Sequence, residues 1–338
     1  MLKKIIHISS SSNFGGGPDF IYSICKYSNN KSYYYGPRGQ KIKDISKFCK
    51  IITTNFTFFF NSFLIKKIFD YKINNIHLHG RGALVYNFIN LLVIKSLKKK
   101  INFIYTPHGI NIKFFFINYL INIFCWFFID KITFVSRDEY NTYTKLYKLK
   151  NAFFIIKNGV YINKNVKNNR TLKNKNIISF SKFNKQKNSI EFCKIAHKLP
   201  QFTFYIYGEG TLKQKCIEYC KVNNIKNVNF NGFTFNTQRA ILKGFCYLST
   251  SKWEGLPLSV LQAISLNRSI CLTRVPGHKD FLELKFKNIK YYPLGNINKA
   301  TKCILSLHNN FNCKLNLQKF YSNYDINTTV KEYNNLFI

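Results

Sequence analysis

Residues 245–262 read Phe-Cys-Tyr-Leu-Ser-Thr-Ser-Lys-Trp-Glu-Gly-Leu-Pro-Leu-Ser-Val-Leu-Gln. The apolar start of this stretch predicts a short buried strand over 245–249. Gly255 allows the chain to bend, and Pro257 suits the first turn of a helix. Gln262 follows Glu254 by eight residues, which along a helix is roughly 12 Å, about the reach of a sugar–diphosphate–ribose unit.

Short apolar runs of the same kind recur along the chain, separated by longer stretches with helical character. They predict strands near 3–8, 75–79, 101–105, 131–135, 153–156, 176–181, 202–207, 227–231, 245–249 and 269–273. Strands that alternate with helices imply parallel sheets covered on both faces. Residues 161–176 have little apolar content and separate two such series. We therefore expect an α/β protein with domains at 1–160 and 177–338, a linker at 161–176, and a last helix that packs back on the first domain.

The composition sets the class of protein. The chain has 338 residues, 46% of them hydrophobic, which is enough for two buried cores and argues against disorder. Its 52 Lys+Arg against 14 Asp+Glu give a formal net charge of +38, spread over both halves. Part of this excess reflects the Lys-, Asn- and Ile-rich usage that an AT-rich coding sequence favours. Such a surface attracts phosphates, anionic lipid headgroups and nucleic acid.

Several familiar sites are missing from the sequence. There is no D-x-D, no H-E-x-x-H, no P-loop and no G-x-S-x-G, so we predict no metal site and no cofactor. His77 and His79 would point to one face of a strand, but no third ligand is evident, which favours a structural role. The ten cysteines contain no C-x-x-C pair, and Cys216 and Cys220 fit one face of a helix, so we expect reduced, mostly buried thiols typical of a cytoplasmic protein.

Residues 114–129 form an uncharged, strongly apolar run. At 16 residues it falls short of the roughly 20 that a spanning helix needs. Asn118, Asn122 and Cys125 would lie on one helical stripe. We expect a helix buried under the first sheet, with docking on lipid as the alternative.

Three loops rich in glycine or lysine follow expected strands, and two of them have the composition of anion-binding turns. Gly15, Gly16 and Gly17 precede an expected helix, where backbone amides can approach an anion. Lys182, Lys185 and Lys187 follow the expected strand at 176–181, well placed to neutralise a diphosphate. Gly208-Glu209-Gly210 forms a further tight turn at the end of a strand.

Taken together, these segments resemble glycosyltransferase family 4, the retaining nucleotide-sugar transferases. The resemblance covers nearly the whole chain, and it rests on an ordered set of motifs: Phe14-Gly15-Gly16-Gly17, Thr106-Pro107-His108-Gly109, Val135-Ser136, Asn158-Gly159-Val160, Lys182 with Lys187, Gly208-Glu209-Gly210, Val228 to Gly232, and Trp253-Glu254-Gly255-Leu256-Pro257. It implies the GT-B fold, with two facing Rossmann-like domains, parallel sheets and an interdomain cleft.

The resemblance also implies residue roles. The catalytic set would be Glu254, His108, Lys182 and Lys187. The donor-binding set would be Gly16, Gly17, Lys182, Lys187, Gly208, Glu209, Glu254, Gly255, Leu256, Pro257, Leu258, Ser259 and Gln262. Two positions depart from the family: Lys182 stands where Arg is usual, and Gln262 stands where the second acid of the E-x7-E motif is usual. The alternative for Glu254 is a surface carboxylate beside Lys252, and for His108 a hydrogen-bonded loop histidine.

The expected activity is that of a metal-independent, retaining glycosyltransferase of the hexosyltransferase type, acting in bacterial envelope polysaccharide, lipopolysaccharide or capsule synthesis. Its partners would be a nucleotide-sugar donor, a glycan or lipid-linked acceptor, and an anionic membrane surface, with nucleic acid the less favoured partner. It would be cytoplasmic, peripheral on the inner face of the plasma membrane. The alternative functions are those of a GT-B sugar-nucleotide epimerase and of a non-enzymatic basic protein that binds membrane or nucleic acid.

Overall fold

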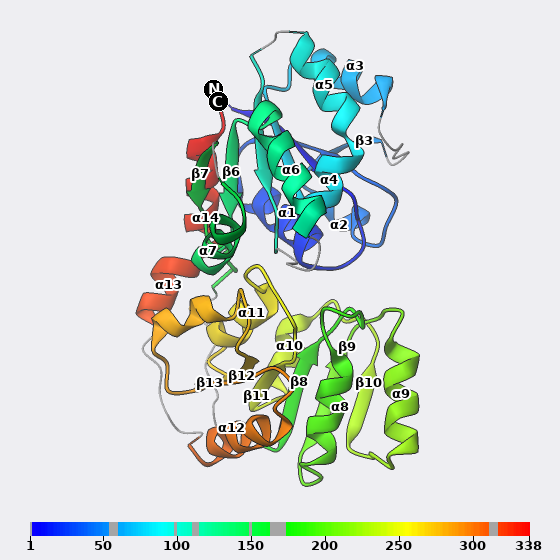
Figure 1. Cartoon of the computed structure of the whole chain (residues 1–338), viewed down its shortest axis with the longest axis vertical. Coiled ribbons are helices and arrows are strands. Elements are labelled where there is room, and N and C mark those ends of the chain that lie inside the picture. Colours follow the sequence, from blue (N-terminus) through cyan, green and yellow to red (C-terminus); the bar gives the residue numbers. More distant parts are fainter. Residues whose placement is uncertain are drawn as a thin grey trace. The chain divides into compact units, whose positions relative to one another are not determined.

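The computed structural model describes residues 2–53, 60–97, 100–109, 115–148, 151–162, 174–310 and 317–338. The chain divides into a first unit, residues 1–161 with 324–338, and a second unit, residues 162–323 (Figure 1). The C-terminal segment thus belongs to the first unit. Most of the expected linker, residues 163–173, lies outside the described residues.

The first unit is built on a seven-stranded, all-parallel sheet with the order β3-β2-β1-β4-β5-β6-β7. The order runs outward in both directions from β1 and β4, so these adjacent strands form the point where the connections change direction. The strands are β1 Lys4–Ser9, β2 Lys31–Tyr35, β3 Lys50–Thr53, β4 Asn75–His79, β5 Asn102–Thr106, β6 Lys131–Phe134 and β7 Ala152–Ile155.

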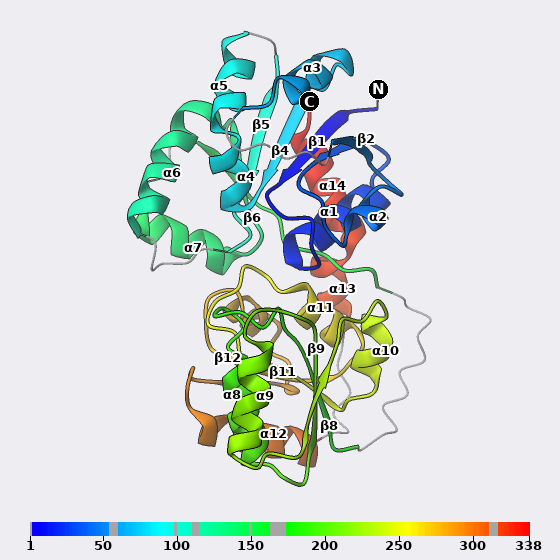
Figure 2. The same cartoon turned by 90° about the vertical axis from the view of Figure 1, so that its right-hand side faces the viewer.

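The two faces of this sheet differ in chemistry because side chains alternate along each strand. One face is apolar, with Ile6, Ile76 and Phe134 among its residues. It packs against helices α3 Ser62–Asp70, α4 Gly80–Tyr86, α5 Phe88–Ser96, α6 Phe115–Phe128 and α7 Arg137–Leu146. The opposite face carries buried polar side chains and lies under α1 Gly16–Tyr27 and α14 Ile326–Leu336, which contact each other (Figure 2). Tyr333 of α14 donates a hydrogen bond to Thr133 of β6, 3.3 Å away.

Helix α6 is only half buried, so the expectation of a buried helix was partly wrong. Ile121, Asn122 and Cys125 face the core, whereas Phe116 and Phe127 are 69% and 65% exposed. Burial of Asn122 is possible because its amide is paired with the hydroxyl of Tyr143 and the carbonyl of Lys148. The solvent side of α6 therefore carries large apolar side chains. Among the described residues, no helix is both long and apolar enough to cross a membrane.

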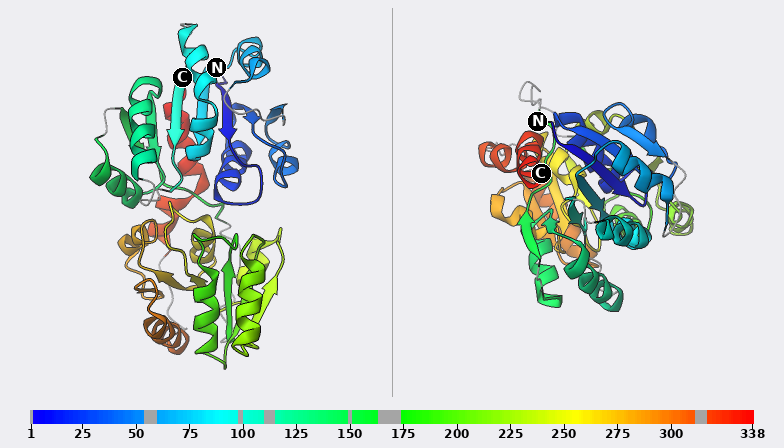
Figure 3. Two further views of the ribbon diagram at one scale, coloured as in Figure 1. Left: turned by 45° about the vertical axis from the view of Figure 1, so that its right-hand side comes forward. Right: turned by 90° about the horizontal axis from the view of Figure 1, so that it is seen from above.

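The second unit repeats the plan with a six-stranded parallel sheet in the order β10-β9-β8-β11-β12-β13. Its strands are β8 Asn176–Phe180, β9 Thr203–Tyr207, β10 Val228–Asn231, β11 Cys246–Ser249, β12 Ser269–Thr273 and β13 Ile289–Tyr292. Helices α8 Ser189–His197, α9 Lys213–Val222 and α12 Ile297–Asn309 cover one face. Helices α10 Thr237–Leu242 and α11 Leu258–Ser265 cover the other (Figure 3). A short 3-10 helix, Lys279–Leu284, lies between β12 and β13 in sequence, and α13 Gln318–Tyr324 follows α12.

Each of the ten expected strands is present within a residue or two of its predicted position, which confirms the α/β fold class. Three strands were missed: β2, β3 and β13. The nine described cysteines are all buried and free, as expected. Cys216 and Cys220 both face the core from α9.

Candidate functional site

In the second unit, β8 and β11 are the adjacent strands at which the strand order changes direction. Open α/β sheets bind ligands at this point, outside the carboxyl ends of the strands. Residues 181–188 follow β8, and residues 250–257 follow β11. Backbone and side-chain hydrogen bonds join the two loops. Lys252 N–H donates to the carbonyl of Gln186 at 2.8 Å, and the Gln186 amide donates to the carbonyl of Trp253 at 2.9 Å.

An ion pair lies between these loops. Lys187 Nζ is 2.6 Å from Glu254 Oε1, and Glu254 is buried. The second carboxylate oxygen, Oε2, accepts from the Gln186 amide at 3.4 Å. Two of the predicted catalytic residues, 67 positions apart in sequence, are thus in direct contact. Glu254 is not a surface carboxylate beside Lys252, because it is buried and paired with Lys187.

The pair keeps both groups charged. Burial by itself would raise the pKa of Glu254, but the neighbouring Lys187, with His278, lowers it below its usual value. Burial would likewise lower the pKa of Lys187, yet Glu254 outweighs this effect and raises it. At neutral pH the site therefore holds a carboxylate and an ammonium side by side.

Glycines allow neighbouring turns to approach this pair closely. Gly277, with φ +82°, lies against the carbonyls of Glu254 and Gly255, where a Cβ would come within 2.5 Å. Gly208 and Gly210 lie against the carbonyls of Ser181 and Lys182, and a Cβ on either would approach closer than 2 Å. No other residue fits these positions without moving the backbone.

The remaining predicted donor residues have varied surroundings. Lys182 is exposed, and Glu209 is paired with Lys213 at 2.8 Å. Around the start of α11, Gly255, Leu256 and Pro257 are buried, whereas Leu258, Ser259 and Gln262 are half-buried.

Helix α11 begins at Leu258, one residue after Pro257, which occupies the N-cap. Only part of the separation between Glu254 and Gln262 is therefore helical. The predicted spacing of 12 Å assumed a continuous helix between the two residues, which the structure does not have.

In the first unit, the corresponding point lies between β1 and β4. Gly16 and Gly17 form the first residues of α1, and a Cβ at either would meet no atom of the described residues within 4 Å. His79 is the last residue of β4, and His108 follows β5. His108 has a left-handed backbone with φ +58°, is half-buried, and its surroundings lower its pKa to about 4 through desolvation.

The paired histidines His77 and His79 have a third neighbour that the sequence did not reveal. His7 of β1 is opposite His77 in the strand register, and one ring nitrogen from each of the three lies within 4.8 Å of the other two. His79 connects this group to His108, with its Nδ1 3.0 Å from His108 Nε2. The statement that no third ligand-type residue accompanies the pair was thus wrong.

Other residues that hold the two sites were also missed. Glu139 accepts hydrogen bonds from the backbone N–H groups of Gly109 and Val135, which anchors the turn after His108. His278, which lowers the pKa of Glu254, is itself fixed by the carbonyl of Thr273 at 2.8 Å. The positions of Gln186 and His7 follow from strand adjacency, and the topology rule for parallel sheets is the signal that could have found them.

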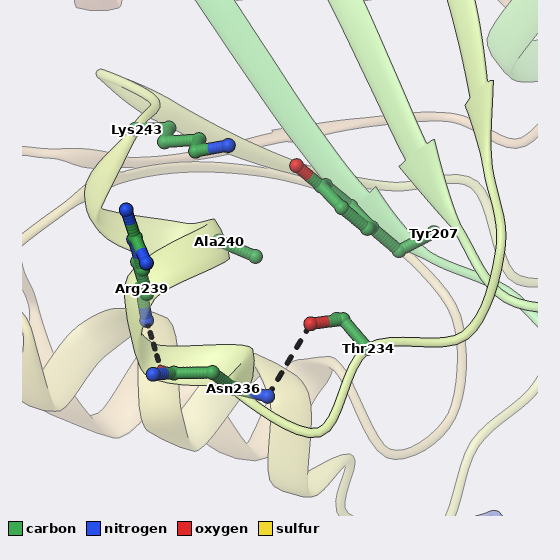
Figure 4. A pocket seen from close by; sticks show the side chains of 6 residues that line it. All are labelled: Tyr207, Thr234, Asn236, Arg239, Ala240 and Lys243. Atoms are coloured by element: carbon green, nitrogen blue, oxygen red, sulfur yellow. Dashed lines mark hydrogen bonds between the residues drawn. The ribbon is translucent and has the colours of Figure 1, made fainter.

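A separate cavity of about 370 Å³ opens in the second unit (Figure 4). Tyr207, which directly precedes the Gly208 turn, lines it together with Thr234, Asn236, Arg239, Ala240 and Lys243. Asn236 caps α10 by accepting from the backbone N–H of Arg239 at 2.9 Å. Two basic side chains make this cavity electropositive, and none of its residues was predicted.

These two parallel-sheet units define the GT-B fold. A crystal structure of Anabaena Alr3699/HepE, in complex with UDP and glucose, superimposes with a TM-score of 0.83 over 98% of both chains, at 14% identity. At that identity the likeness establishes the fold and no more.

The match to a protein family lies within the second unit. Residues 174–310 match the family model of Glycosyl transferases group 1. The chain is 34% identical over 109 residues to the poly(ribitol-phosphate) alpha-N-acetylglucosaminyltransferase of Staphylococcus aureus, covering 32% of this chain and 22% of that one. It is 35% identical over 83 residues to the uncharacterized glycosyltransferase MJ1059 of Methanocaldococcus jannaschii, covering 24% and 20%. The matches span about a fifth of the length of these curated relatives.

Proposed function

We propose that this protein is a glycosyltransferase of family 4 that transfers a sugar from a nucleotide-sugar donor to an acceptor hydroxyl with retention of configuration. The Lys187–Glu254 pair supports this proposal most directly. It lies where the strand order of the second unit changes direction, which we call the switch point, and this unit contains the match to the group 1 model. The fold, shared with a protein crystallised with UDP and glucose, is compatible with a UDP-hexose donor.

The chemistry of the pair suits a sugar diphosphate. An ammonium has three N–H donors, and Glu254 accepts one from Lys187, so two remain for phosphate oxygens. The Glu254 carboxylate has further lone pairs that can accept from sugar hydroxyls. Lys182 and Lys185, both exposed, add positive charge on the same loop.

In the proposed reaction, the bond between the anomeric carbon and the diphosphate oxygen breaks and a bond to the acceptor oxygen forms. The acceptor proton passes to the departing diphosphate. Lys187 stabilises the negative charge that develops on the leaving group, which is the electrostatic contribution that usually dominates such catalysis. We propose that no metal is required, since lysines supply this charge.

The acceptor is proposed to be a glycan or lipid-linked saccharide, and the pathway bacterial envelope polysaccharide synthesis. Support comes from the Staphylococcus aureus relative, which acts on poly(ribitol-phosphate). We also propose a cytoplasmic protein that docks on the anionic inner face of the membrane. The exposed side chains of Phe116 and Phe127 on α6 supply apolar area, and Lys95 of α5, bonded to the carbonyl of Phe127, supplies adjacent positive charge.

Membrane docking is tested by co-sedimentation with phosphatidylglycerol vesicles. Binding should fall with salt and weaken in Phe116→Ser/Phe127→Ser, whereas absence of binding at low salt would leave α6 without this role.

Turnover is tested by incubating the protein with UDP-glucose, UDP-galactose and UDP-N-acetylglucosamine, with and without oligosaccharide acceptors, and measuring released UDP. Acceptor-dependent release that persists in EDTA supports the proposal. Interconversion of nucleotide sugars without UDP release would identify an epimerase, and activity restored only by added Mg²⁺ or Mn²⁺ would refute metal independence.

A further inference from the structure

Four histidines of the first unit form a connected group on the polar face of the sheet. The rings of His77 and His79 have centroids 3.9 Å apart, and His7 lies 5.2 Å from His79. His79 stacks on His108 with an interplanar angle of 17° and a centroid distance of 5.3 Å. Phe20 of α1 packs edge-on against His108, 4.9 Å away. Three of the four rings are buried, and His108 alone is half-exposed.

Two hydrogen bonds join three of these rings in series. His7 Nδ1 is 3.0 Å from His79 Nε2, and His79 Nδ1 is 3.0 Å from His108 Nε2. A neutral imidazole carries one N–H and one lone pair, so both bonds must run in the same direction. Burial lowers the pKa of His79 well below its usual value and that of His108 to about 4, which keeps these rings neutral at pH 7.

The surroundings of His7, at one end of the hydrogen-bonded series, favour one direction of donation. His7 Nε2 is buried and makes no well-formed hydrogen bond among the described residues, although the Cys25 thiol, a weak donor and a weak acceptor, lies beside the His7 side chain. If the bonds ran from His108 to His7, this atom would be a buried N–H with only a thiol sulfur to accept it. In the other direction it is a buried lone pair, and orphaned buried donors are the rarer of the two in proteins. Donation therefore runs from His7 to His79 and from His79 to His108, and His108 must carry its own proton on Nδ1.

We propose that His79, held in turn by His7, is a positioning residue that fixes His108 as the Nδ1–H tautomer, so that His108 donates a hydrogen bond to an oxygen atom of the bound substrate. This inference rests on the proposed function for the identity of the substrate, but not for the tautomer. His108 acts here as a neutral donor and not as a base, because its Nε2 lone pair is already used. The left-handed backbone at His108 and the stacking of His79 hold the ring in one orientation.

A metal ion is the competing occupant of this cluster, because three ring nitrogens come within 4.8 Å of one another. One feature counts against it. Both nitrogens of His79 are engaged by other imidazoles, so neither lone-pair position of this ring is available to a metal ion.

The tautomer is tested without substrate, by long-range ¹⁵N–¹H spectra of protein labelled in histidine. The wild-type protein should show His108 protonated on Nδ1. His79→Leu should release it toward the Nε2–H form that free histidine prefers in water. His79→Asn places an amide N–H at the same number of bonds from Cβ as Nδ1 and should restore the Nδ1–H form.

His77→Leu is the matched control, since His77 is equally buried and touches His79 but bonds to Thr106 instead of His108. It should leave the His108 signals unchanged. If His79→Leu does not fold, as judged by its melting curve, His7→Leu provides a second variant. Without the donor His7, the hydrogen bond between His79 and His108 is no longer held in one direction.

Activity gives an independent readout. In His79→Leu, kcat should fall about tenfold with donor KM little changed, and His79→Asn should recover most of this loss. A wild-type His108 protonated on Nε2, or a His79→Leu variant with unchanged tautomer, would overturn the proposal. So would stoichiometric metal in the dialysed protein, or joint shifts of His7, His77 and His79 signals on addition of Zn²⁺. If the tautomer shifts as expected but no nucleotide sugar is turned over, the positioning role stands and the proposed function fails.

Discussion

The two units have the same kind of switch point and fill it with opposite chemistry. In the second unit, the loops after β8 and β11 place a charged Lys187 against a charged Glu254 at 2.6 Å. In the first unit, β1, β4 and the turn after β5 place His7, His79 and His108 in a hydrogen-bonded series. The site in the second unit is built from full charges that support each other, whereas in the first unit the burial of His79 and His108 lowers the pKa of both rings and keeps them uncharged.

This difference shows what topology does and does not determine. Strand order brings residues distant in sequence to the same edge of a sheet in both units. Whether the site then binds an anionic group or donates a neutral hydrogen bond depends on the side chains placed there. Because each site depends on a different protonation state, the units should respond differently to mutation and to pH.

Removing one charge from the ion pair should have the largest effect. Glu254→Gln leaves Lys187 without its buried counter-charge, and we expect loss of more than a hundredfold in turnover together with destabilisation on the order of 3 kcal/mol. Urea unfolding and UDP release measure the two effects.

Asp70→Asn is the matched control for stability. Asp70 pairs with Lys67 at 3.4 Å on the surface, so its loss should change stability by less than about 1 kcal/mol. A Glu254→Gln variant as stable and as active as the wild type would show that the ion pair contributes to neither stability nor turnover.

The next largest effect should be a difference between the two units in how their stability depends on pH. The folded pKa values of His77 and His79 lie well below 6.5 and that of His108 is about 4, so the unfolded chain binds protons first as the pH falls. The first unit should therefore lose stability from about pH 6.5 downward, by up to about 1.4 kcal/mol per pH unit for each histidine. The lowered pKa of Glu254 has the same sign, but its loss begins only below about pH 4.3.

Hydrogen exchange resolved by peptide between pH 7.5 and 5 measures this contrast. Peptides of the first unit should lose protection before those of the second. Equal loss in both units would mean that the histidines are not held neutral.

The smallest effect is expected at Gln262. If its amide hydrogen-bonds a ribose hydroxyl, Gln262→Ala should cost on the order of 1 kcal/mol, or roughly a fivefold rise in donor KM with kcat nearly unchanged. Gln262→Glu should bind the donor at least as tightly, since the contact gains a charge. Loss of turnover at saturating donor would place Gln262 at the reacting sugar instead, and no change in either variant would place it outside the site.

Much of the fold could be predicted because buried parallel strands are continuous apolar runs. Ile177-Ile178 and Ile270-Cys271-Leu272 are examples, and both lie where expected. The missed strands lack this signal. Residues 31–35 are Lys-Ser-Tyr-Tyr-Tyr, which periodicity does not distinguish from a loop or helix, and they become a strand because they pair with β1.

The sites were predicted only as separate residues. Motifs located Lys187, Glu254 and His108, but contacts between residues far apart in sequence follow from the order of strands, which no local pattern contains. His7 illustrates this limit, since its neighbours His77 and His79 are 70 or more positions away. The exposed apolar side of α6 was missed for a different reason: composition shows that the helix is apolar, but not which side packs against the sheet.

The central claim is that the switch point of the second unit binds a nucleotide sugar through Lys187, and calorimetric titration tests it most directly. UDP-glucose, UDP-galactose and UDP-N-acetylglucosamine are titrated into the wild type, Lys187→Ala and Lys185→Ala. Lys185 is the matched control, because it is exposed and lies on the same loop but has no part in the pair. The account predicts saturable binding of at least one donor, weakened tenfold or more by Lys187→Ala and little by Lys185→Ala. Binding that is absent from the wild type, or equally affected by both variants, would contradict it.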